Sequence, residues 1–187
     1  GILLAGGLGT RLSPLTKVAS KQLLPVYDKP LVYYPLSTLM LANIREILVI
    51  ASPNQIERFE HLLGDGAEFG LSISFKIQDK PAGIAESLVL AEEFLAGMKS
   101  SLVLGDNLFH GSGLGRRLQA FNDVSGAQIF GYHVQDPSPY GVATVNQLNE
   151  VTELNEKPKN SESKIAIPGL YFFANSAVEK SKKLKKS

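Results

Sequence analysis

The chain has 187 residues, of which 44% are hydrophobic and 20% charged, with a formal net charge of +1 and no cysteine. This length and composition indicate a folded domain with a sizeable core, and the near-neutral charge gives no field that would attract nucleic acid or an anionic membrane. The absence of cysteine excludes disulfides and thiolate metal sites. No apolar run reaches the roughly 18 residues of a membrane span. We expect no signal peptide and a cytoplasmic protein.

Short apolar segments typical of strands alternate with segments of helical spacing through the first part of the chain. In chain order, the patterns predict strands at 2–5, 46–52, 71–78, 101–107 and 127–134 and helices at 33–44, 54–66, 83–97 and 113–123. Asn54 is the expected N-cap of the second helix and Gly64 its expected end. Continuous apolar strands separated by helices favour a mostly parallel sheet covered on both faces. We therefore expect a three-layer α/β/α, Rossmann-like fold.

The pattern changes after Asp136, where strands follow one another without helices between them. Strands are predicted within 140–158 and 164–174, and a last helix over 176–187. We expect these strands to extend the same sheet in antiparallel fashion, within a single domain. The last helix has no Gly, Asn or Pro to end it, and Gly1 already lies at the edge of a strand, so we expect a fragment of a longer chain.

A glycine-rich segment at 6–11, GGLGTR, follows the first strand. A P-loop would need Lys and then Ser or Thr after the last glycine, whereas Gly9 is followed by Thr10 and Arg11. The dinucleotide fingerprint would need its third glycine where Leu12 stands. Both familiar phosphate loops are therefore excluded, and the segment alone is also compatible with a structural turn.

Polar residues that suit a phosphate ligand follow several of the predicted strands. In an open parallel sheet, ligands bind beyond the carboxyl ends of the strands, and there this chain carries the glycine segment, Gln78 and Asp106. Arg11 and Lys21 lie in the connection after the first strand and could neutralise charge on a triphosphate. Each of these residues alone is compatible with a purely structural role, at the surface or as a helix cap. Together they favour a phosphate-binding site.

Taken in order, the motifs resemble those of the sugar-nucleotide pyrophosphorylases, and more narrowly the glucose-1-phosphate thymidylyltransferase branch. The resemblance is carried by LLAGGLGTRLSPLT and SKQLLPVYDKPLVYYPLSTLMLANIREILVI, then by FEHLLGDG, LVLGDNLFHG, YHVQDPSPYGVA, NEKP and GLYFF. It implies the reaction dTTP + α-D-glucose 1-phosphate ⇌ dTDP-glucose + pyrophosphate, with Mg²⁺. It also implies a nucleotide-binding half at 1–135 and the start of a sugar-binding half at 136–187, the rest of the family's domain being absent.

The resemblance assigns the catalytic roles to Arg11, Lys21 and Asp106. Arg11 would hold the departing pyrophosphate, Lys21 would stabilise charge at the α-phosphate, and Asp106 would bind Mg²⁺. The residues expected to bind the nucleotide are Leu4, Ala5, Gly6, Gly7, Gly9, Thr10, Arg11, Gln22, Gln78, Pro81, Gly83 and Asp106. Among these, Gln78 and Gly83 would contact the nucleobase. Glu86 departs from the resemblance, because it stands where the thymidylyl enzymes usually carry Gln.

The residues expected to bind the sugar phosphate are Asn107, Tyr140, Gly141, Glu156, Lys157 and Gly169. Glu156 would accept from sugar hydroxyls, and Lys157 would pair with the phosphate. The family's second metal-binding aspartate has no match in this sequence, so we expect residues 1–187 alone to bind nucleotide with little or no catalysis. The implied partners are dTTP or UTP, glucose 1-phosphate and pyrophosphate, with neither nucleic acid nor membrane, and a homotetramer is the implied assembly.

Two alternatives stay open at this point. Uridylyl transfer from UTP is one, because a Gln side chain can serve the imide edge of thymine or of uracil, although SKQLLP favours the thymidylyl branch. A nucleotide-sugar binding module without turnover is the other. The presence of Arg11, Lys21 and Asp106 argues against that second alternative.

Overall fold

The structure, a computed structural model, describes residues 1–7, 9, 12–80 and 83–184. It divides into two compact units, the first made of residues 1–128 and 172–187 and the second of residues 129–171. The C-terminal segment from residue 172 belongs to the first unit, and the expected functional halves on either side of residue 135 stay a prediction.

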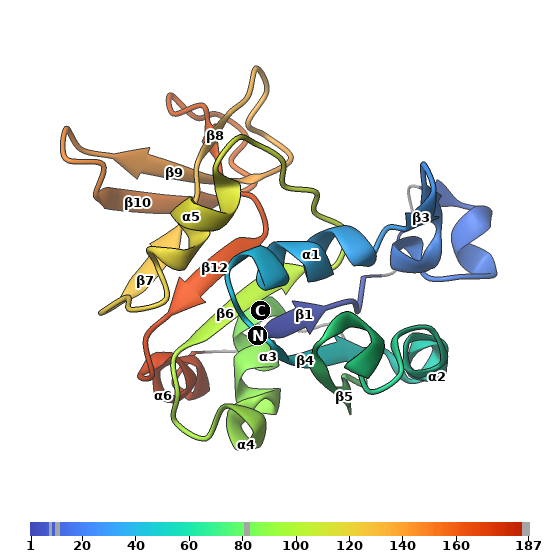
Figure 1. Cartoon of the computed structure of the whole chain (residues 1–187). Coiled ribbons are helices and arrows are strands. Elements are labelled where there is room, and N and C mark those ends of the chain that lie inside the picture. The colour runs from blue at the N-terminus through green and yellow to red at the C-terminus, as the bar shows by residue number, and fades with distance from the viewer. Residues whose placement is uncertain (8, 10–11, 81–82, 185–187) are drawn as a thin grey trace. The chain divides into compact units, whose positions relative to one another are not determined.

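The first unit is built on a sheet whose described strands follow the order β5-β4-β1-β6-β12-β7 (Figure 1). These strands are β1 (Ile2–Leu4), β4 (Glu46–Ala51), β5 (Ser72–Ile77), β6 (Ser100–Leu104), β7 (Ala127–Ile129) and β12 (Leu170–Phe173). The pairs β1–β4, β1–β6 and β4–β5 are parallel, and Figure 1 draws β12 running opposite to β6. The predicted mostly parallel central sheet is therefore confirmed.

The strand register places the carboxyl ends of four strands at one level. Leu4 of β1 lies beside Ile50 of β4 and Leu104 of β6, and Ile50 in turn lies beside Lys76 of β5. Side chains of β1, β4 and β6 are buried along almost their full length. Register is strongly specified wherever a strand packs a buried face, and these strands are buried on both faces, so the common level is strongly specified.

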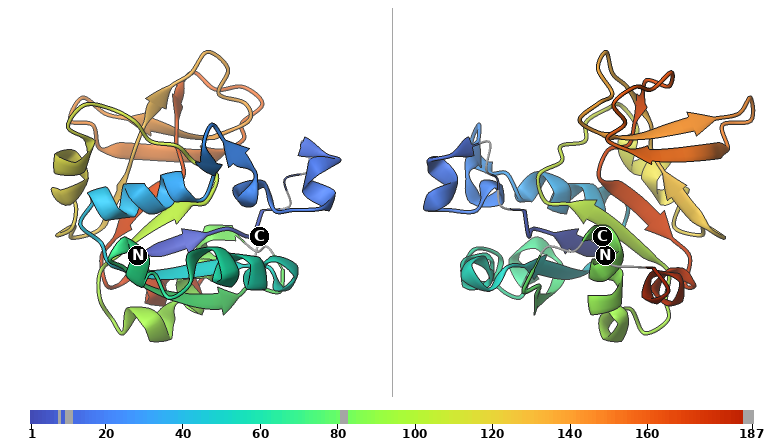
Figure 2. Two further views of the ribbon diagram at one scale, coloured as in Figure 1. Left: turned by 45° about the vertical axis from the view of Figure 1, so that its right-hand side comes forward. Right: turned by 180° about the vertical axis from the view of Figure 1, so that it is seen from behind.

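Helices cover both faces of this sheet (Figure 2). They are α1 (Tyr33–Leu41), α2 (Pro53–Leu63), α3 (Gly83–Leu90), α4 (Glu92–Leu95), α5 (Leu114–Gln119) and α6 (Ala177–Lys182). Figure 1 shows α1 and α5 on one face and α3, α4 and α6 on the other, while α2 packs against β4 and β5. Apolar side chains such as Leu39, Phe59 and Leu88 fill the layers between helices and strands. No helix in the described part of the chain is long and apolar enough to cross a membrane.

Several predicted element boundaries differ from those observed. The helix predicted at 54–66 begins one residue earlier, with Pro53 in its first turn and Ser52 at the N-cap position, so the expectation of Asn54 as N-cap is wrong. Proline is favoured there because the first helical N–H needs no acceptor. Gly64 does end the helix, with φ of 55°. The helix predicted at 83–97 is divided between α3 and α4 at Ala91.

The connection after β1 contains structure that the sequence patterns did not predict. It holds two short 3₁₀ helices, η2 (Leu15–Lys17) and η3 (Lys21–Leu23), and a small hairpin of β2 (Pro25–Val26) and β3 (Lys29–Pro30). A further 3₁₀ helix, η4 (Ala67–Phe69), follows α2. Such short elements lack the apolar periodicity on which sequence prediction depends.

The second unit is an antiparallel sheet in which the described strands follow the order β10-β9-β11-β8. They are β8 (Tyr132–His133), β9 (Gly141–Val145), β10 (Val151–Glu156) and β11 (Ile165–Ala166). The expectation that this region extends the central sheet is therefore wrong for these strands, which pair among themselves. The strand predicted at 127–134 is interrupted at Phe130 and Gly131, so that β7 and β8 belong to different sheets.

Gly66 offers a test of local packing with a matched control. Both Gly66 and Gly70 have left-handed backbone, but a Cβ on Gly66 would lie 2.6 Å from Ile73 Cγ1, whereas one on Gly70 meets nothing within 4 Å. Each Gly→Ala change costs about 1–2 kcal/mol for the backbone, and overpacking adds about 1–3 kcal/mol at Gly66. Urea unfolding should therefore show G66A to be clearly less stable than G70A. Equal losses in the two variants would contradict this packing.

Candidate functional site

Loops that follow β1, β4, β5 and β6 are joined at one edge of the first unit's sheet. Gly105 N donates to Leu4 O at 2.8 Å, and Ala5 N donates to Ile50 O at 2.7 Å. Gln78 N donates to Ala51 O at 2.8 Å. The strand-end residues predicted from the sequence are therefore brought to a common edge.

The glycine segment begins at this edge. A Cβ on Gly6 would lie 3.1 Å from the Oε1 atom of Gln78, so the absence of a side chain at Gly6 leaves room for that amide oxygen. Gly9 has φ of 58°, and its carbonyl accepts from Thr16 Oγ1 at 3.0 Å and from Leu12 N at 2.9 Å. The predicted site residues Thr10 and Arg11 lie outside the described residues.

Lys21 and Asp106 form an ion pair beside this segment. Lys21 Nζ lies 2.9 Å from Asp106 Oδ2, and the two side chains are 34% and 32% exposed. Lys21 also lies near Gly9, because a Cβ on Gly9 would be 3.1 Å from Lys21 Cβ. The partly open pair thus presents a cation and a carboxylate next to the glycine segment.

Gln22 ties the Lys21 segment to two of the loops. Gln22 is 3% exposed, and its Oε1 accepts a hydrogen bond from Ser20 Oγ. A Cβ on Gly105 would lie 3.1 Å from Gln22 Cγ, and one on Gly7 would lie 3.8 Å from Gln22 Nε2. Gln22 therefore packs between the loops after β1 and β6, a structural position that sequence reasoning had described only as nucleotide-binding.

Two residues of α2 that sequence reasoning missed hold the same segment from another side. Gln55 Oε1 accepts from Ser20 N at 3.1 Å, and the Arg58 guanidinium donates to Val18 O. Gln55 and Arg58 are three residues apart on one helix, which places them on one face. That spacing was the only available signal, and it is too common to have identified them.

Gln78 and Glu86 form the polar contact at the end of β5. Gln78 is 4% exposed, and its Nε2 donates to Glu86 Oε2 at 2.6 Å. Glu86 lies in the first turn of α3, which begins at Gly83 with φ of 85°. The structure therefore brings Gln78 close to the helix that carries Gly83. Pro81 lies outside the described residues.

Asp106 offers carboxylate oxygens, the kind of ligand that a hard cation takes. Its Oδ2 accepts from Lys21 and its Oδ1 from Asn107 Nδ2 at 2.9 Å, and each carboxylate oxygen can accept more than one partner. The described residues contain no group of three or more His, Cys, Asp or Glu side chains that could hold a metal. Mg²⁺ commonly takes only one or two carboxylates and completes its shell with waters and phosphate oxygens. A single carboxylate is compatible with that pattern, so the predicted role of Asp106 toward Mg²⁺ stays a prediction.

The residues predicted to bind the sugar phosphate lie mainly in the second unit. Glu156 at the end of β10 pairs with Gly141 at the start of β9, and Lys157 N donates to Tyr140 O at 3.0 Å. Lys157 Nζ lies 3.1 Å from Glu156 Oε1, with both side chains well exposed. These four residues are thus gathered at one end of the β9–β10 hairpin, whereas Gly169 is buried just before β12.

Tyr171, the last residue of the second unit and part of β12, is a further residue that sequence reasoning did not single out. Burial raises the pKa of its phenol, and the nearby Glu156 carboxylate raises it further. The phenol therefore stays protonated at neutral pH and remains a hydrogen-bond donor.

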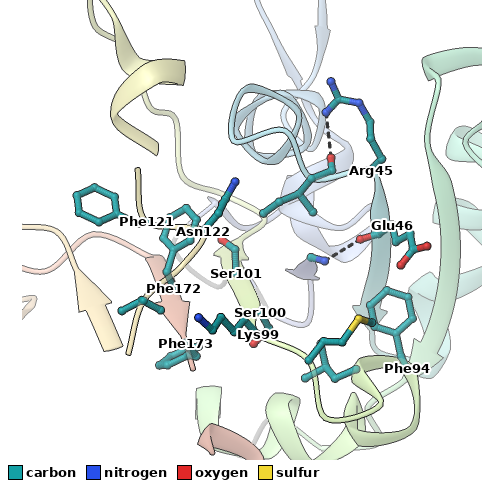
Figure 3. Close-up of a pocket in the computed structure, with 15 residues that line it drawn as sticks. Arg45, Glu46, Phe94, Lys99, Ser100, Ser101, Phe121, Asn122, Phe172 and Phe173 are labelled. Carbon is teal, nitrogen blue, oxygen red and sulfur yellow. Dashed lines mark hydrogen bonds between the residues drawn. The ribbon is translucent and has the colours of Figure 1, made fainter. Parts of the chain in front are cut away.

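A pocket of about 400 Å³ lies at the other end of the first unit's strands (Figure 3). It is lined by Gly1 beside β1, by Glu46 at the start of β4, by Ser100 and Ser101 at the start of β6, and by aromatic side chains such as Phe121 and Phe172. Ser101 Oγ is buried there without a hydrogen-bond partner among the described residues. Among the predicted site residues that the structure describes, none lines this pocket.

The chain matches the Nucleotidyl transferase family over residues 1–187. It is 51% identical over 187 residues to the glucose-1-phosphate thymidylyltransferase of Mycolicibacterium smegmatis, and 50% identical over 188 residues to that of Neisseria meningitidis. All of this chain is covered in both cases, and it spans 65% of the length of each relative.

Solved structures give the same picture of the fold. A Bacillus anthracis protein assigned to the glucose-1-phosphate thymidylyltransferases and crystallised with sucrose superposes with a TM-score of 0.91 at 36% identity, covering 100% of this chain and 76% of that one. A UDP-glucose pyrophosphorylase with bound UDP-glucose has a TM-score of 0.80 at 22% identity, covering 98% of this chain and 79% of that one, and so shares the fold. With a match along its whole length, the chain belongs to the nucleotidyl transferase family.

Proposed function

We propose that the protein of this chain is a glucose-1-phosphate thymidylyltransferase, which converts dTTP and α-D-glucose 1-phosphate into dTDP-glucose and pyrophosphate. The observation that carries the proposal is the partly exposed Lys21–Asp106 pair at the strand edge, next to the glycine segment. The choice of substrates is supported by sequence identities of 51% and 50% to relatives of that name. Assembly as a homotetramer and a cytoplasmic location, which the resemblance and composition led us to expect, belong to the same proposal.

The reaction places negative charge on the phosphates as the pyrophosphate leaves. Lys21 would move from Asp106 to the α-phosphate and stabilise that charge, since a positioned cation is worth most where charge develops. Asp106 would hold Mg²⁺, which neutralises phosphate charge when bound. Arg11 keeps the proposed role of holding the pyrophosphate. No general base is needed, because the second pKa of a phosphate monoester is about 6, so its oxygen is mostly ionised at neutral pH.

Nucleobase and sugar would be recognised by different groups of residues. Gln78, buried at the end of β5, would contact the nucleobase together with the backbone at Gly83. In the second unit, Lys157 would pair with the phosphate of the sugar and Glu156 would accept from its hydroxyls. The exposure of Lys157 and Glu156 leaves both groups accessible to a ligand.

Uridylyl transfer is the nearest alternative, because Gln78 offers the same hydrogen-bonding groups to uracil as to thymine. We expect the full-length protein to release pyrophosphate faster from dTTP than from UTP when glucose 1-phosphate and Mg²⁺ are supplied. A coupled pyrophosphate assay across several nucleoside triphosphates and sugar 1-phosphates measures this directly. Faster use of UTP would overturn the thymidylyl assignment, and nucleotide binding without release would favour the binding-module alternative.

Lys21 provides a sharper test of the chemistry. Replacement by Met keeps the length of the side chain and removes its charge, so K21M should lower kcat/KM by roughly 10²–10³-fold, as the loss of one charge-stabilising donor does in other enzymes. Lys17 lies in the same connection and is exposed, so K17M is the matched control and should stay near the wild-type rate. Equal losses in K17M and K21M would show a general charge effect instead.

Asp106 can be tested through the metal requirement. D106N keeps the shape of the side chain but weakens a hard-cation ligand, so the Mg²⁺ concentration for half-maximal pyrophosphate release should rise at least about tenfold, the cost of losing one charged partner. Asp123 pairs with Lys99 beside the pocket at the other end of the strands, and D123N should leave the Mg²⁺ curve unchanged. An unchanged curve for D106N would remove Asp106 from the metal site.

A further inference from the structure

The side chain of the buried Gln78 makes a directional, partly buried contact with that of Glu86. Gln78 Nε2 donates to Glu86 Oε2 at 2.6 Å, a short distance typical of a charge-assisted hydrogen bond. Gln78 is 4% exposed, and its backbone N–H is bound to Ala51 O. Hydrogen bonds therefore hold Gln78 both at its backbone N–H and at its side-chain amide.

This contact fixes which atom of the Gln78 amide faces the glycine segment. An ionised carboxylate only accepts hydrogen bonds, so the NH₂ of the amide must point toward Glu86. The Oε1 atom then points elsewhere, and it lies beside Gly6, where a Cβ would be 3.1 Å away. The amide consequently presents an acceptor at the strand edge.

The geometry points to Glu86 as a positioning residue that makes the site selective for nucleobases with an N–H at ring position 3. This inference rests on the proposed function in that it takes the edge at Gln78 as the nucleobase site. Thymine and uracil carry that N–H as a donor, whereas cytosine has a lone pair at the same position. The fixed oxygen of Gln78 would bind the first two and repel the third.

The identity of residue 86 determines how strongly the orientation is imposed. A Gln there could accept from Gln78 or donate to it, because an amide has both an acceptor and a donor. Either orientation of Gln78 would then be satisfied, and the acceptor would no longer be forced toward the nucleobase. With Glu at position 86, only one orientation keeps the buried amide hydrogen-bonded, and an unpaired buried polar group is costly.

The experiment compares binding of dUTP and dCTP, two nucleotides that share sugar and phosphates and differ in the base at ring positions 3 and 4. Calorimetry on the full-length protein with Mg²⁺ gives both dissociation constants. Wild type should prefer dUTP, and E86Q should reduce that preference about tenfold, which corresponds to one hydrogen bond. Glu93 is exposed on α4, so E93Q is the matched control and should retain the wild-type ratio.

The double exchange Q78E/E86Q gives a rescue test. In that variant the amide introduced at position 86 donates to the carboxylate introduced at position 78. The remaining oxygen of that carboxylate again offers only an acceptor, so the preference for dUTP should return. The inference would be overturned if E86Q left the ratio of the dCTP and dUTP dissociation constants unchanged, whether or not binding of both nucleotides became weaker. A merely structural role of Glu86 would affect the binding of both nucleotides alike. A wild type that prefers dUTP in binding but releases no pyrophosphate would support the inference and contradict the proposed function.

Discussion

The common level at which β5, β4, β1 and β6 end is the constraint on which the site depends. Register is strongly specified in parallel strands with buried faces, so residues that follow different strands arrive at one edge. Gln78 and Asp106 are nearly thirty positions apart in sequence but each stands just beyond a strand of this level. The chemistry at the edge is therefore a product of packing in the core, where Leu3, Val49 and Leu102 are fully buried.

Lys21 reaches this edge from a segment that has little regular structure, and three separate attachments hold that segment. Gln55 and Arg58 of α2 bind the backbone before Lys21, and the buried Gln22 packs between the loops that follow β1 and β6. The third attachment is the ion pair with Asp106, which is open enough to exchange partners. A partly exposed pair contributes little to stability, so its rearrangement by a ligand would cost the fold little. The contacts that fix the segment and the ion pair that can exchange its partner thus involve different side chains.

Much of this arrangement could be predicted from the sequence, and the failures have physical reasons. Apolar periodicity located β4, β6 and α2, and the carboxyl-end rule for parallel sheets brought Gln78 and Asp106 to one edge. The separate sheet of β8 to β11 was missed because alternating strands carry no signal of their partners, and the break at Phe130 and Gly131 resembles a continuous strand. Gln55 and Arg58 could not be identified, since their contacts join distant segments. The orientation of the Gln78 amide likewise depends on Glu86, a contact that spacing alone does not reveal.

The order of strands in the first unit's sheet has a consequence for how the chain folds. β12 lies between β6 and β7, although β7 precedes it in sequence by the whole length of the second unit. β7 therefore has no neighbour in the sheet until residues 170–173 have been synthesised. Pairing between distant segments is slow because loop-closure entropy is spent before contacts form. During synthesis, one side of β6 therefore stays unpaired while the second unit is made. An unpaired edge strand is the part of a nascent sheet that most readily pairs with a wrong strand.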